Sequence, residues 1–106
     1  MAMYMELLPS VTKKYRAIFY DKDRKKIKTI QFGQKGAKDF TKHTKEDRDA
    51  RKTSYINRHK KRENWDNPMT AGALSRWILW NKPTIEASWK DYKERFNIKK
   101  LYRKKY

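Results

Sequence analysis

Few side chains in this chain have the types and spacing of a catalytic or metal-binding site. The two histidines, His43 and His59, lie sixteen positions apart, and the chain contains no cysteine, so a metal site would need distant carboxylates as further ligands. The carboxylates of Asp21 and Asp23, and those within residues 46–49, could act as a general acid and base in hydrolysis. Acidic residues in a turn and at a helix start explain both groups more simply. We therefore expect no catalytic residue, no metal site and no cofactor, and a protein that is not an enzyme.

The strongest chemical feature is an excess of basic side chains. The 106 residues include 29 Lys and Arg against 12 Asp and Glu, which gives a formal charge of +17. Residues 13–38 hold ten basic residues and two acids, residues 42–62 hold nine and three, and residues 97–106 hold five and no acid. Residues 63–96 are neutral, with five of each, and contain all four tryptophans. A chain of this charge is expected to bind a polyanion or an acidic protein surface, and not a small-molecule substrate.

Two groups of basic residues are the predicted binding sites for an anionic partner. One is the C-terminal segment, where no acid compensates the charge, and the other is the end of a basic helix. These residues are Lys99, Lys100, Arg103, Lys104 and Lys105, and Arg58, Lys60, Lys61 and Arg62. Clustered Lys and Arg suffice for phosphate binding by counterion release, so nucleic acid is one candidate partner. The interleaved Tyr102 and Tyr106 could stack on bases or equally anchor the tail in a protein groove.

The elements that must position these residues begin with two strands. Tyr15, Ala17 and Phe19 alternate with other residues over 14–20, and a second β-rich run over 26–32 follows a short polar loop with two aspartates. This pattern predicts an antiparallel hairpin. A third strand could lie at 38–41, because a two-stranded hairpin alone is only marginally stable.

Three helices are expected after the strands. Thr44, which precedes several acids, predicts the start of a helix that runs to about Arg62. Asn67 and Pro68 predict the start of a second helix, which ends before residue 83. Thr84 predicts the cap of a third helix. Its apolar residues recur at helical spacing, and they are Ile85, Trp89, Tyr92 and Phe96.

Together these patterns predict one small domain of the α+β class. It has an N-terminal antiparallel β-hairpin of two or three strands, then three α-helices and a basic C-terminal tail. The domain is expected over residues 14–96, with an N-terminal extension over 1–13 and the tail over 97–106. The aromatic content of 14% allows a core despite the charge. The first residues have no basic segment and reach a proline at position 9, so we expect neither a signal peptide nor a membrane span.

Three stretches of the sequence resemble a group of viral proteins. They are Lys14–Asp21, the Phe32–Gly33 step and, above all, the motif from Asn64 to Thr84, which reads NWDNPMTAGALSRWILWNKPT. Over residues 14–96 the chain resembles a family of small basic, functionally uncharacterised proteins of large eukaryotic double-stranded DNA viruses (nucleocytoplasmic large DNA viruses, phycodnavirus-like). The resemblance implies a viral origin and a component of the virion, and it assigns no catalytic residue.

Charge and resemblance together predict a non-enzymatic structural protein of the virion. It would be a minor capsid or cementing component that binds neighbouring capsid proteins through its core surface and extended termini, after synthesis in the host cytoplasm or nucleus. Its expected apolar anchors are Tyr4, Leu7, Leu8, Trp80, Tyr102 and Tyr106. The alternative is a basic nucleic-acid-binding protein that condenses or packages viral DNA. In that case the helix after Thr44 is the expected groove-binding element, through Arg51, Lys52, Asn57, Arg58 and Arg62.

Overall fold

A four-stranded sheet forms one part of the protein. The structure is a computed structural model, and it describes residues 3–101. Its strands are β1 (Tyr4–Pro9), β2 (Tyr15–Tyr20), β3 (Lys26–Phe32) and β4 (Lys99–Lys100), in the order β3-β2-β1-β4. β1 pairs with β2 and β2 with β3 in antiparallel fashion, whereas β4 pairs with β1 in parallel. The sheet is therefore mixed, and its two central strands come from the first twenty residues.

Side chains on both faces of β2 are buried, since Ile18 and Tyr20 are buried as well as the core residues Ala17 and Phe19. Ala17 and Phe19 are fully buried, and Ala17 lies opposite Ile30 in the register with β3. The turn between these strands is held by Asp21, whose carboxylate accepts hydrogen bonds from the backbone N–H groups of Asp23 and Lys25, both at 2.9 Å. This is the local role that aspartate commonly has in turns.

The helices follow the first three strands in the chain. They are the short 3-10 helix η1 (Phe40–Lys42), α1 (Lys45–His59), α2 (Ala71–Leu74), the π-helical turn η2 (Ser75–Leu79) and α3 (Ile85–Phe96). The hydroxyl oxygens of Thr70 and Thr84 accept hydrogen bonds from Ala73 N and Ala87 N, each at 3.1 Å, and so cap α2 and α3.

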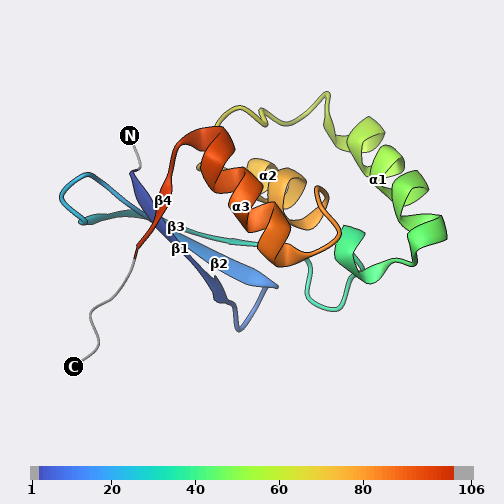
Figure 1. The fold of residues 1–106 in the computed structure, drawn as a ribbon, viewed down its shortest axis with the longest axis horizontal. Helices are drawn as coiled ribbons and strands as arrows, with labels where there is room; N and C mark the ends of the chain where they lie inside the picture. The colour runs from blue at the N-terminus through green and yellow to red at the C-terminus, as the bar shows by residue number, and fades with distance from the viewer. Residues whose placement is uncertain (1–2, 102–106) are drawn as a thin grey trace.

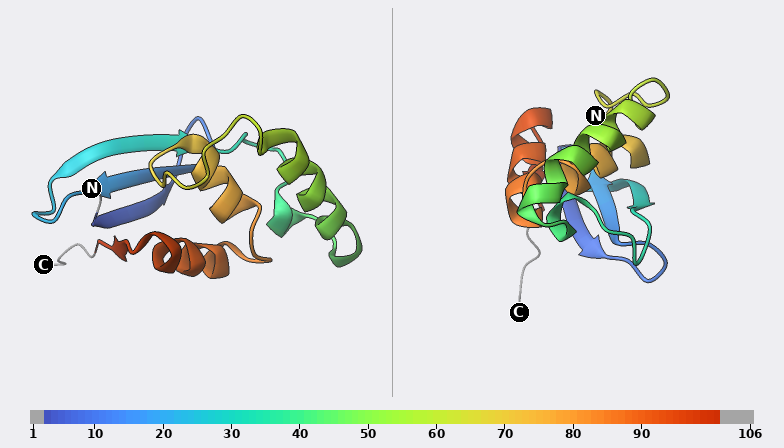
Figure 2. Two further views of the ribbon diagram at one scale, coloured as in Figure 1. Left: turned by 90° about the horizontal axis from the view of Figure 1, so that it is seen from above. Right: turned by 90° about the vertical axis from the view of Figure 1, so that its right-hand side faces the viewer.

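The core lies between one face of the sheet and the pair formed by α2–η2 and α3. α1 lies beyond this pair, at the end of the molecule away from the β2–β3 turn (Figure 1 and Figure 2). The buried core residues are Met5, Ala17, Phe19, Phe32, Leu74, Ile78, Leu79, Tyr92 and Ile98. α1 packs mainly through Tyr55, whose ring stacks on Trp80 with the centroids 4.9 Å apart.

The predicted fold class is wrong in its sheet. The expected sheet was an N-terminal antiparallel hairpin of two or three strands, and the structure has a mixed sheet of four. Residues 4–9, expected in an extension, form the inner strand β1, and residues 99–100, expected in the tail, form β4. The segment around 38–41 contributes η1 in place of a third strand. β4 depends on pairing with residues more than ninety positions away, which local alternation does not report. β1 pairs with the adjacent strand β2 across residues 10–14, so here the sequence analysis missed a local hairpin.

One helix start differs from expectation and one is confirmed. Thr44 is the N-cap residue of α1, as predicted, although its side chain makes no capping hydrogen bond, and α1 ends at His59 and not at about Arg62. Asn67 and Pro68 precede the second helix without starting it, because Thr70 is the residue that caps α2. Within residues 3–101, no helix has the length and apolar character needed to cross a membrane.

Candidate functional site

A groove lined mainly by basic side chains lies between the C-terminal half of α3 and the β1–β4 edge of the sheet. Its volume is about 670 Å³. We call it the basic groove, and the described residues that line it are Tyr4, Arg24, Lys90, Lys93, Glu94, Asn97, Ile98, Lys99, Lys100 and Leu101. Five of these are basic and one is acidic, so the groove presents a positive surface.

The turn at the end of α3 builds the groove. Asn97 adopts the left-handed conformation (φ 52°, ψ 47°), which asparagine tolerates better than most residues. Ile98 N then donates a hydrogen bond to Lys93 O at 3.0 Å, and the Ile98 side chain enters the core with 3% of its surface exposed. The chain continues beside β1, where Leu101 N donates to Met5 O at 2.9 Å. A groove is left between β4 and the helix that precedes it.

Arg24 forms part of the opposite wall from an unusual backbone conformation. It lies in the β2–β3 turn with φ at 63°, a region in which residues other than glycine are strained. Its guanidinium carbon is 5.3 Å from the centroid of the Tyr4 ring, a cation–π distance. The turn thus holds a charged, planar group over an aromatic ring at the mouth of the groove.

Four of the five basic side chains of the groove, those of Arg24, Lys90, Lys93 and Lys99, form no ion pair with a carboxylate among the described residues. Within residues 3–99, three Lys and Arg side chains form ion pairs with carboxylates, and they are Lys14 with Asp39, Arg51 with Asp47, and Arg95 with Asp91. None of the three basic residues lines the groove. Charges that converge on a concave surface raise the local concentration of an anionic ligand.

A second cavity, of about 450 Å³, lies between α1, α2 and the end of β3. Its central charges are satisfied within the protein. Lys14 Nζ is 2.6 Å from the carboxylate of Asp39. The carboxylate of Glu63 contacts His59 Nδ1 at 3.0 Å and accepts a hydrogen bond from Trp65 Nε1 at 2.7 Å. The Lys14–Asp39 pair attaches η1 to the sheet, and Glu63 joins the end of α1 to the segment that follows it.

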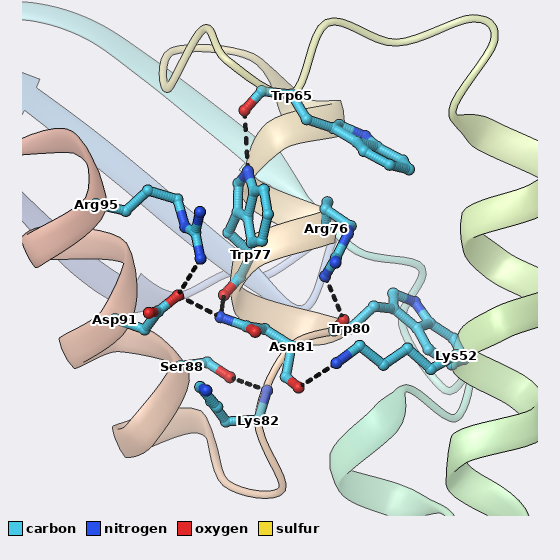
Figure 3. Close-up of polar contacts among 10 residues, drawn as sticks. All are labelled: Lys52, Trp65, Arg76, Trp77, Trp80, Asn81, Lys82, Ser88, Asp91 and Arg95. Atoms are coloured by element: carbon cyan, nitrogen blue, oxygen red, sulfur yellow. Dashed lines mark hydrogen bonds and ion pairs between the residues drawn. The ribbon is translucent and has the colours of Figure 1, made fainter.

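The long motif between Asn64 and Thr84 supplies a stack of arginine and tryptophan side chains (Figure 3). Arg95 and Arg76 flank the Trp77 ring, with their guanidinium carbons 3.7 and 4.2 Å from its centroid. Arg76 also lies 5.5 Å from the Trp65 ring centroid. Burial lowers the pKa of Arg76, and the two indole rings compensate part of its lost hydration.

Asn81 connects this stack to its surroundings. Its side-chain amide donates to Asp91 Oδ2 at 2.7 Å and to Trp77 O at 3.1 Å, and its backbone carbonyl oxygen accepts from Lys52 Nζ at 2.9 Å. Burial, followed by the charges of Arg76 and Lys82, lowers the pKa of Lys52. The network therefore joins α1, η2 and α3, and its function is structural.

The structure separates the basic residues that the sequence grouped as binding sites. Lys99 and Lys100 line the basic groove, whereas Arg103, Lys104 and Lys105 lie outside the described residues. Arg58, Lys60, Lys61 and Arg62 are exposed at the end of α1 and in the following turn, at the opposite end of the molecule from β4 (Figure 1). On α1 itself, Lys52 is half-buried, and Arg51 is exposed but pairs with Asp47, so fewer cations of this helix are both exposed and unpaired than its sequence suggests.

Four of the six expected apolar anchors pack within the domain. Leu7 lies against the core, Tyr4 and Leu8 are half-buried in β1, and Trp80 stacks on Tyr55. The other two, Tyr102 and Tyr106, lie outside the described residues.

Sequence reasoning missed three of the five basic residues of the groove. Lys90 and Lys93 are three apart on α3 and so share a helix face, a signal that the neutral charge of residues 63–96 concealed. Arg24 gave no signal, because its position over Tyr4 depends on the pairing of β1 with β2.

Comparison with known proteins gives a family and no function. Residues 5–59, from β1 to the end of α1, match a family of unknown function, DUF5754. The chain belongs to this family. No curated protein and no solved structure matches it. Within residues 3–101 there is no cluster of three or more His, Asp and Glu side chains that could hold a metal ion.

Proposed function

We propose that this DUF5754 protein is a non-enzymatic nucleic-acid-binding protein whose ligand lies in the basic groove. The observation that supports the proposal is the composition of the groove, five basic side chains and one acid around a volume of about 670 Å³. Phosphate binding requires clustered cations that release counterions from the nucleic acid, and no reacting group.

The type of cation favours nucleic acid over an acidic protein surface. Four of the five basic groove residues are lysines, and lysine is depleted in protein–protein interfaces, where arginine and aromatic residues are enriched. The large exposed apolar side chains among residues 3–101 are Met3, Val11 and Ile27. Three such side chains are too few for the apolar centre that a stable protein interface needs.

Fluorescence anisotropy with a labelled DNA of mixed sequence, single-stranded and duplex, tests the proposal. We expect binding at low salt and a linear fall of log K with log salt concentration. Lys90→Gln with Lys93→Gln should weaken binding at least about tenfold and reduce the salt slope by one to two units, since each lost phosphate contact removes roughly 0.7–0.9. The charge-matched control is Lys13→Gln with Lys45→Gln. Both control residues are exposed and lie outside the groove.

Two results would contradict the proposal. One is the absence of binding to either DNA at low salt. The other is an equal loss of affinity in the groove and control variants, which would mean that net charge alone, and not the groove, holds the ligand.

The virion role expected from the sequence resemblance stays a prediction. The resemblance and the basic charge are its support. Residues 4–9 do not add to it, because they form an inner strand and so do not extend onto neighbouring capsid proteins. Its test is the protein content of purified, nuclease-treated particles. A fixed ratio to the major capsid protein would favour a minor capsid component, and loss of the protein with the DNA would favour the nucleic-acid role.

A further inference from the structure

We infer that the basic groove binds a single strand, with one base on the Tyr4–Arg24 pair and the neighbouring phosphates on Lys90, Lys93 and Lys99. This inference rests on the proposed function and specifies its ligand. It follows from the shape of the site, from the pair at its mouth and from the backbone of the β2–β3 turn.

The concave shape of the site differs from the projecting elements that usually read a duplex. Proteins read duplex DNA with an element that projects into the major groove. Here the cations line a hollow of about 670 Å³, a volume in the range of pockets that enclose a small ligand. A hollow of this size matches a base with its flanking phosphates better than it matches a duplex, which is read by an element that projects into its groove.

The Tyr4–Arg24 pair supplies the base-binding element. Single strands are held by grooves that combine positive charge with aromatic rings, on which bases of any identity stack. Arginine guanidinium planes offer a second stacking surface. The guanidinium carbon of Arg24 lies 5.3 Å from the centroid of the Tyr4 ring, so the two stacking groups are adjacent. The lysines of α3 and β4 line the same groove.

The backbone of Arg24 is a further indication of function. Its φ of 63° is one that glycine would adopt without strain. Strained residues are found disproportionately at binding sites, where the side chain is required. The charge and planar shape of Arg24 at the groove mouth account for the presence of arginine at this turn.

The experiment compares three labelled ligands of about 12 nucleotides: oligothymidine, the same strand with a central run of abasic sites, and a duplex of equal length. We expect oligothymidine to bind at least about tenfold more tightly than either of the others. Tyr4→Ala should lower the affinity for oligothymidine about 5- to 150-fold and leave the salt slope unchanged, because stacking and not charge is lost. Tyr4→Phe should retain the affinity.

Further variants separate stacking, charge and folding. Lys93→Gln should reduce the salt slope by about 0.7 on oligothymidine, with Lys13→Gln as the matched control. Because Tyr4 is half-buried in β1, Tyr4→Leu serves as a second variant that keeps an apolar strand residue, and its thermal midpoint verifies folding. It should lose affinity as Tyr4→Ala does.

The outcomes separate this inference from the proposed function. Equal or tighter binding of the duplex, still weakened by Lys90→Gln with Lys93→Gln, would overturn the single-strand inference and leave nucleic-acid binding standing. Unchanged affinity in folded Tyr4→Ala and Tyr4→Leu, or equal affinity for the abasic strand, would overturn the stacking role. Failure to bind any of the three ligands at low salt would overturn both.

Discussion

The buried ion pair between Lys14 and Asp39 allows a quantitative test of how η1 is attached to the sheet. One oxygen of the Asp39 carboxylate is 2.6 Å from Lys14 Nζ, and the other accepts hydrogen bonds from Thr41 N at 2.9 Å and Thr41 Oγ1 at 2.6 Å. The two charged side chains are 14% and 5% exposed. Both charges are therefore largely removed from water, and each depends on the other.

Asp39→Asn isolates the charge of this pair. Asparagine keeps the shape of the side chain and an oxygen that can accept from Thr41 N, so the cap of η1 is retained. The ammonium of Lys14 is left buried without a counter-charge. Breaking a buried pair costs about 3–5 kcal/mol, and we expect the lower end, about 3 kcal/mol, because Lys14 keeps some contact with solvent.

A double-mutant cycle measures the coupling. Lys14→Met should cost less than Asp39→Asn, because the carboxylate keeps its two hydrogen bonds from Thr41. The double variant should be more stable than the sum of the single losses predicts, with a coupling energy of about 2 kcal/mol. Free energies of unfolding from urea titrations, followed by tryptophan fluorescence, supply the four values. A loss below about 1 kcal/mol for Asp39→Asn, or additive losses within about 0.5 kcal/mol, would refute the reasoning.

Three further predictions concern the core and the turns. Burial raises the pKa of Tyr92 above its ordinary value near 10, so as the pH rises the unfolded chain loses the Tyr92 proton before the folded protein does. The free energy of unfolding is therefore unchanged by this group below about pH 10, and above it falls by up to about 1.4 kcal/mol per pH unit. Urea midpoints from about pH 9 to 11 should show a shallower fall in Tyr92→Phe, and an unchanged slope would contradict the assignment. Arg24→Gly should raise the free energy of unfolding by up to about 1 kcal/mol, because it relieves a positive φ. The same variant should bind nucleic acid more weakly. A loss of stability together with the loss of binding would show that the role of the arginine is structural. Gly33→Ala should lower the free energy of unfolding in urea by about 1–3 kcal/mol more than Gly36→Ala does. Both glycines have a positive φ, but the new Cβ would lie 2.9 Å from Leu79 Cδ1 at Gly33 and would contact nothing at Gly36. Equal losses would show that the Leu79 side chain moves aside at little cost.

Local patterns in the sequence were informative wherever neighbouring residues determine the structure. The alternation of Tyr15, Ala17 and Phe19 and the aspartate-rich turn predicted the pairing of β2 with β3, which is present. Thr84 caps α3 as expected. The helix-start signal at Asn67 and Pro68 was misleading, because the first residues after them form turns whose polar groups are satisfied locally, with Asn67 Oδ1 accepting from Met69 N at 3.1 Å.

The sequence by itself determined the excess of positive charge, the segments that alternate and the helix with the clearest apolar stripe. Only the tertiary structure decided which charges share a surface. The groove joins Tyr4, Arg24, Lys93 and Lys99, which come from four separate parts of the chain. Their proximity depends on the parallel pairing of the two-residue strand β4 with β1 and on the left-handed turn at Asn97. A strand of two lysines carries no periodic signal, because its position results from the burial of Ile98 and from hydrogen bonds to a strand that lies more than ninety residues away in the sequence.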